Sequence, residues 1–261
     1  MLDEQGLAAV LDWELAYTGD PVADLGWLCV RSWRFGAPLP VAGLGTRAEL
    51  LTASEQAGGR PVPPQTLHWW EVLGTLRWAV LCMMQARGHL ERGVRSVELA
   101  AIGRRVCEVE LDLLELLPGA SQLPVDVEVP PAAQALWPTL HDRPTAAELL
   151  TAVREFLDGL ELTGRDRFLA LVSSRVLDTV GRELTLGVVL AAEHAARLAE
   201  LGVACNAELA SVIRAGQLAP DRANESVRAA VIAKLQVADL SQLTDRVGNE
   251  SVHHNQERVR T

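Results

Sequence analysis

One stretch of the sequence constrains the fold more than any other. Between residues 165 and 201, apolar or small residues return at every third or fourth position: Leu169, Val172, Val176, Val180, Leu184, Gly187, Leu190, His194, Leu198 and Leu201. This period matches one face of an α-helix. The stretch therefore predicts a single very long amphipathic helix, and we expect a helix of this kind to pack against a partner or against itself.

Two residues on this stripe differ from their apolar neighbours. Gly187 has no side chain and would let a neighbouring helix approach closely. His194 could be a ligand, but a hydrogen-bonded interior histidine is the favoured interpretation.

Shorter helical patterns surround the long one. Thr145 and Glu148 form a capping box that predicts a helix start. The apolar residues after it, expected to point inward, are Leu149, Val153, Phe156, Leu157 and Leu160. Two more helices are predicted, one over residues 206–215 and one that begins at an Asn224 cap. This half offers no grouping of nucleophile, base and orienting residue.

The first half is also mostly helical. A capping box of Thr46 and Glu49 predicts one helix, which ends at Gly58 and Gly59. Apolar periodicity predicts a second helix over residues 65–87 and a third over residues 96–117. The later part of the 65–87 helix is apolar nearly all round, so we expect it to be central and buried.

Prolines divide the chain into two parts. They concentrate in one short span at Pro118, Pro124, Pro130, Pro131, Pro138 and Pro144. A helix does not persist through this density of proline. The sequence therefore predicts a first domain over residues 1–118, a linker over 119–143, a helical domain over 144–243 and a polar tail over 244–261.

Composition excludes several classes of protein. The chain has 261 residues, of which 49% are hydrophobic, which is typical of a globular protein. Its formal net charge of −10 argues against a general nucleic-acid binder, which needs a basic face. We expect no membrane span, no signal peptide and a cytoplasmic location, with the four cysteines as reduced thiols.

The candidate metal-binding residues lie in the stretch over residues 7–33. A short apolar run, Leu7 to Leu11, is predicted to be a buried strand and ends at Asp12. Asp20 and Pro21 then predict a helix start, with Asp20 as the capping residue. An aspartate at the end of a strand can hold Mg²⁺ together with substrate phosphates. A turn-forming role for Asp12 remains the alternative on these residues alone.

The order of motifs in this stretch resembles a known family. Asp12-Trp13-Glu14, Gly19-Asp20-Pro21 and Asp24-Leu25-Gly26 follow one another as they do in the aminoglycoside phosphotransferase and choline kinase-like family. Within it, the chain looks closest to the kinase-like domains associated with acyl-CoA dehydrogenases. The resemblance implies a mainly α fold: the helical C-terminal lobe of a protein-kinase-like fold with a residual N-terminal β-hairpin, followed by a second all-α domain. That second domain resembles a helical domain of unknown function.

The resemblance also implies roles for individual residues. Asp12 matches the aspartate that binds the Mg²⁺ on ATP, Glu14 would support that metal, and Asp24 would brace the catalytic loop as a structural residue. Helices of this lobe line the acceptor pocket in the family, which makes Trp70 and Glu71 candidates for substrate contact. The cofactors expected for the family are therefore Mg²⁺ and ATP, with the alternative that this chain binds neither. The acceptor is a small-molecule hydroxyl, and that of a hydroxyacyl-CoA is the specific candidate.

Other parts of the family pattern have no counterpart in the sequence. The catalytic loop, His-Gly-Asp-x-x-x-Gly-Asn, would stand before the apolar run, where Asp3 to Gly6 reads as a hairpin turn instead. A Gly-x-x-x-x-Gly-Lys phosphate loop is also missing. We therefore expect the isolated chain to be inactive as a kinase. One alternative is completion by a separate N-terminal polypeptide. The other is a non-catalytic helical interaction module, either a pseudoenzyme or a truncated product, with a homodimer as one candidate assembly.

Overall fold

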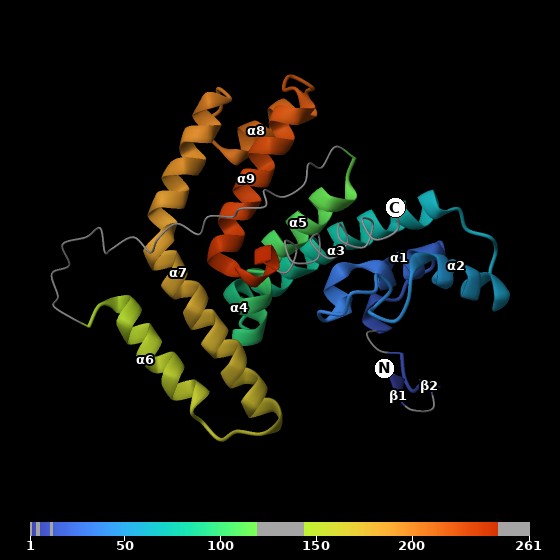
Figure 1. Ribbon diagram of the computed structural model, residues 1–261, viewed down its shortest axis with the longest axis horizontal. Helices are drawn as coiled ribbons and strands as arrows, with labels where there is room; N and C mark the ends of the chain where they lie inside the picture. Colours follow the sequence, from blue (N-terminus) through green and yellow to red (C-terminus); the bar gives the residue numbers. More distant parts are fainter. Residues whose placement is uncertain (1, 4–5, 11–12, 119–143, 245–261) are drawn as a thin grey trace, which may run out of the picture. The chain divides into compact units, whose positions relative to one another are not determined.

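The computed structural model describes residues 2–3, 6–10, 13–118 and 144–244. Within these residues the fold is mainly α-helical with one short β-hairpin, as the sequence predicts (Figure 1). The contacts divide the chain into two compact units, Met1–Thr75 and Leu76–Thr261. None of the described helices combines the length and the apolar character that a membrane span requires.

The first unit begins with the hairpin. Strands β1 (Leu2–Asp3) and β2 (Gly6–Leu7) pair antiparallel, with Leu2 opposite Leu7 and Asp3 opposite Gly6. The predicted buried strand over residues 7–11 is wrong, because β2 ends at Leu7 and Val10 is 56% exposed. A strand keeps its conformation only while a neighbour pairs with it, and the partner strand here is two residues long.

Helices complete the first unit. The 3₁₀-helix η1 (Trp13–Leu15) is followed by α1 (Val22–Cys29), the 3₁₀-helix η2 (Arg31–Arg34), α2 (Arg47–Gln56) and the first turns of α3 (Pro64–Glu91). The Thr46–Glu49 capping box is confirmed by its two reciprocal hydrogen bonds. The core of this unit forms around Cys29, Val41 and Leu67.

The second unit contains the rest of α3, α4 (Val97–Gly103), α5 (Val106–Leu116), α6 (Ala146–Asp158), α7 (Gly164–Glu200), α8 (Asn206–Arg214) and α9 (Pro220–Ala238). The long predicted helix is confirmed by α7. Where one helix was predicted over residues 96–117, two are present, interrupted at Arg104 and Arg105. The last helix begins at Pro220 instead of Asn224, because a proline is favoured at a first helical position.

Helices from before and after residues 119–143 share one core in the second unit. Helix α5 contacts α9, and α4 contacts α7. The cluster between α5 and α9 contains Cys107, Leu111, Leu114, Val231, Leu235 and Leu243. The predicted linker and tail lie outside the described residues, and the domain boundaries stay a prediction.

Helix α6 differs from its prediction in the face that it buries. It runs antiparallel to α7, joined by an Arg154–Asp178 ion pair and a Ser174–Asp158 hydrogen bond. Leu149, Val153, Phe156 and Leu160 were predicted to point inward, but they are 38–66% exposed. Periodicity identifies an apolar face but not whether a neighbouring helix covers it.

Candidate functional site

The segment that carries the phosphotransferase-like motifs is anchored where α1 begins. The Asp20 carboxylate accepts a hydrogen bond from the Val22 backbone N–H at 3.0 Å, which is the predicted capping role. Arg60 donates to both oxygens of Asp20, at 2.8 and 2.9 Å. The Val22 N–H and then the Arg60 guanidinium lower the pKa of Asp20, so it stays charged.

A glycine brings α1 against α3. A Cβ at Gly26 would lie 2.6 Å from the backbone carbon and Cβ of Trp70, and 2.9 Å from the backbone nitrogen of Glu71. Contacts this short leave no room for a side chain. The Asp24-Leu25-Gly26 motif therefore has a structural reason for its glycine, which is the close crossing of two helix backbones.

Glu71 lies behind this crossing in an ion-pair cluster. Its side chain is almost fully buried and accepts two hydrogen bonds from Arg47, at 2.7 Å from Nε and 2.5 Å from Nη2. The Nη2 atom of Arg34 lies 3.7 Å from the same carboxylate, and it also donates to the Cys29 carbonyl oxygen at 3.2 Å. The Glu71 carboxylate therefore connects α3 to Arg47 in α2 and to Arg34 in η2.

The other predicted site residues are placed as follows. Asp12 lies outside the described residues, as does the side chain of Glu14, whose backbone belongs to η1. Asp24 is exposed in the first turn of α1. Trp70 is half-buried and meets Trp69 edge-on, with ring centroids 4.7 Å apart. Metal binding, bracing and substrate contact by these four residues and by Glu71 stay predictions.

The described residues contain no group of three or more acidic, histidine or cysteine side chains that could hold a metal ion. Mg²⁺ usually takes one or two protein carboxylates and completes its shell with phosphates and water. Asp12 and Glu14, which are two residues apart in the sequence, would supply two carboxylates, and this is the number of protein ligands that Mg²⁺ usually takes.

The buried thiols do not offer a nucleophile. Burial raises the pKa of Cys29 to about 11, with the nearby Glu71 carboxylate acting in the same direction. Burial likewise raises the pKa of Cys82 to about 11 and that of Cys107 to about 12. These thiols stay protonated near neutral pH, and the thiolate is the reactive form. Cys205 is exposed.

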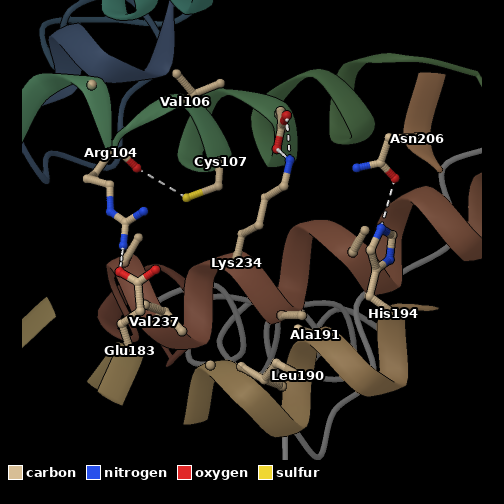
Figure 2. Close-up of a pocket in the computed structure, with 16 residues that line it drawn as sticks. Arg104, Val106, Cys107, Glu183, Leu190, Ala191, His194, Asn206, Lys234 and Val237 are labelled. Carbon is tan, nitrogen blue, oxygen red and sulfur yellow. Dashed lines mark hydrogen bonds and ion pairs between the residues drawn. The ribbon is translucent and has the colours of Figure 1, made fainter. Parts of the chain in front are cut away.

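A pocket of about 410 Å³ opens in the second unit, between α5, α7, α8 and α9 (Figure 2). Its apolar wall includes Val106, Leu190, Ala191 and Val237. A Cβ at Gly187 would contact only the Glu183 side chain, so no neighbouring helix lies against this glycine and the pocket is open beside it. The expected close approach of a neighbouring helix at Gly187 is therefore wrong.

The polar side chains around this pocket each have a partner, although the buried Nδ1 atom of His194 makes no hydrogen bond within the described residues. Arg104 contacts Glu183, and Lys234 donates to both oxygens of Glu110 at 2.8 and 2.9 Å. His194 Nε2 lies 2.8 Å from Asn206 Oδ1, which confirms the predicted hydrogen-bonded histidine. Figure 2 shows these pairs around the opening. The arrangement holds four helices together and leaves an apolar interior.

Sequence reasoning missed the two arginines that bind Glu71. Arg47 lies 24 residues from its partner and Arg34 lies in a short 3₁₀-helix, so neither shares a helical repeat with it. The only available signal was Glu71 itself, an acidic residue among the apolar residues Trp69, Trp70, Val72 and Leu73.

Comparison with known proteins separates the two halves of the chain. Residues 1–65 match the family model of the phosphotransferase enzyme family, which confirms the predicted resemblance and a phosphotransferase lineage for this part. Residues 160–239, which hold the whole of α7, α8 and α9, match a domain of unknown function, DUF6285. Comparisons with curated proteins and with solved structures gave no match.

Proposed function

We propose that this chain carries the metal-binding segment of a phosphotransferase that uses ATP and Mg²⁺ to phosphorylate a hydroxyl group. The observation that carries this proposal is the match of residues 1–65 to the phosphotransferase enzyme family. In the proposal, Asp12 holds Mg²⁺ at the ATP phosphates, Glu14 supports that site and Asp24 braces the loop beside it. The acceptor class is a small-molecule hydroxyl, with a hydroxyacyl-CoA as the specific candidate.

The packing of the first unit supports this assignment of roles. Asp20 is held by a backbone N–H and by Arg60, and Gly26 is held against α3. The segment between Glu14 and Asp24 is therefore attached to a helix that is braced through Glu71. A phosphotransferase depends on such positioning because phosphoryl transfer is catalysed mainly by placement and charge neutralisation.

In the same proposal, the isolated chain does not transfer phosphate. The sequence contains no Gly-x-x-x-x-Gly-Lys loop and no His-Gly-Asp-x-x-x-Gly-Asn catalytic loop. A metal site can hold Mg²⁺-ATP through its phosphates, but alone it neither positions the nucleotide for transfer nor removes the proton from the acceptor hydroxyl. A complementing polypeptide would supply both groups.

A second candidate function is a non-catalytic interaction module. The observation in its favour is the outer face of α6, where Leu149 and Phe156 are 54% and 66% exposed. Contiguous exposed apolar side chains of this size are typical of surfaces that bind another protein.

The test is calorimetric titration of the full chain with Mg²⁺-ATP. Wild type is expected to bind, Asp12→Ala is expected to lose binding, and Glu55→Gln is the matched control because Glu55 is an exposed carboxylate on α2. Addition of a hydroxyl acceptor is expected to give no phosphorylated product. Absence of binding by wild type, or equal binding by Asp12→Ala, contradicts the proposed site and favours the interaction module.

A further inference from the structure

The outer face of α3 is apolar along most of the helix. Large apolar residues on it follow one another at steps of four, three, four, three and seven: Trp69, Leu73, Leu76, Val80, Met83 and Leu90. Their exposed fractions range from 39% to 68%. We call these six residues the α3 seam.

The opposite face of α3 is the buried one. Glu71, Thr75, Ala79 and Cys82 are at most 6% exposed. The sequence predicts that the later part of this helix is central and buried. Within the described residues this prediction is wrong for the seam, whose side chains are exposed. A helix whose outer face meets only water normally carries polar side chains there. The seam therefore has the composition of a contact surface.

The spacing of the seam indicates what covers it. Alternating steps of four and three residues give an average repeat of 3.5, which is the a and d pattern of a coiled coil. A helix with the same repeat fits its side chains between those of the seam. Arg87 occupies the one polar position in the repeat, between Met83 and Leu90, and its guanidinium is bound by Glu91 at 3.0 Å.

The exposed area is large enough to form the centre of a contact. Six seam residues and the adjacent Met84, which is 50% exposed, are on average about half exposed. All but Trp69 are aliphatic, so the lower end of the roughly 150–250 Å² given by an aromatic side chain applies, and they leave on the order of 500 Å² of apolar surface. A patch of this size matches the largest on an ordinary monomer, about 300–600 Å², which is often functional, and it would supply much of the roughly 800 Å² that each partner buries in a standard interface.

We propose that the α3 seam is a homodimer contact, in which α3 packs against α3 of a second copy as a two-stranded coiled coil. A second copy offers a helix with the same repeat and the same length. In a parallel pair the two Arg87 side chains would face each other within the contact, whereas an antiparallel pair separates them. The dimer is therefore antiparallel. This inference does not depend on the proposed phosphotransferase function.

Helix α6 provides a matched control. Leu149, Val153 and Phe156 repeat on it at steps of four and three, Leu160 follows just beyond the end of the helix, and all four are also exposed. This row is shorter than the α3 seam but has similar chemistry. Charges placed on it test whether any exposed apolar row would produce the same association.

The experiment is sedimentation equilibrium of the full chain from about 1 to 100 µM, a range that resolves a dissociation constant of micromolar order. Wild type is expected to reach twice its mass of 28.2 kDa. The variant Leu76→Lys with Met83→Lys is expected to dissociate at least about 100-fold more readily. The control Leu149→Lys with Phe156→Lys is expected to remain dimeric. Circular dichroism checks that all three keep their helix content.

A second measurement avoids substitutions altogether. The sequence has three methionines, of which Met83 lies in the seam, Met84 lies beside it and Met1 lies elsewhere. With wild type, peroxide oxidation of Met83 is expected to slow as the protein concentration rises, while Met1 is unaffected. A monomer at every concentration, or a dimer that only the α6 variant dissociates, overturns the proposal. Slow Met83 oxidation at a concentration where sedimentation shows a monomer also overturns it, because the seam is then covered within one chain.

Discussion

Replacing Arg47 with methionine tests the idea that the Glu71 cluster holds the first unit together. Glu71 is 1% exposed, and Arg47 supplies its two short hydrogen bonds, at 2.7 and 2.5 Å. Methionine keeps most of the aliphatic contacts of arginine but leaves the buried carboxylate with Arg34, whose nearest nitrogen is 3.7 Å away. Arg47→Met therefore removes the hydrogen bonds and most of the charge neutralisation.

The expected cost follows from the burial of the remaining charge. Removing one partner of a buried ion pair typically costs about 3–5 kcal/mol. We expect a value near the lower end, about 3 kcal/mol, because Arg34 remains and Arg47 itself is 41% exposed. For a domain whose total stability is about 5–15 kcal/mol, this is a large fraction.

Urea unfolding followed by tryptophan fluorescence measures this cost. The first unit holds five of the seven tryptophans in the sequence, so the signal reports mainly on it. Arg60→Met is the matched control, because Arg60 is 64% exposed in its pair with Asp20 and should contribute less than about 1 kcal/mol. Equal destabilisation by the two variants would refute the argument that burial makes the Glu71 cluster important.

Two further predictions concern other parts of the fold. Burial raises the pKa of Glu108, and Arg105 offsets this only in part, so the folded state binds the proton more readily than the unfolded state does. Glu108→Gln is therefore expected to raise stability at pH 7, and urea unfolding should show that the gain disappears as the pH falls below the ordinary carboxyl range. Gly26→Ala is expected to cost about 1–3 kcal/mol, because the new Cβ meets the Trp70 backbone. Gly181→Ala, where a Cβ meets nothing within 4 Å, is expected to gain about 0.5–1 kcal/mol. Urea unfolding followed by circular dichroism measures both variants, and an equal response of the two glycines would contradict the packing argument.

Only part of the candidate site could be predicted from the sequence. The order of motifs from Asp12 to Gly26 identified the phosphotransferase family, and residues 1–65 match that family. The capping role of Asp20 was also predictable, because its partner Val22 is two residues away. The arginines around Glu71 and the pocket in the second unit were not, because their side chains come from separate helices.

The sequence by itself determined where most helices form. Capping boxes such as Thr145 with Glu148, and the repeat that produces α7, depend on residues within one or two helical turns of each other. Only the tertiary structure decided which apolar faces are covered, that a break separates α4 from α5, and that Glu71 is an internal ion-pair residue. The physical reason is that burial and ion pairing depend on neighbours far away along the chain, whereas capping and helical periodicity are local.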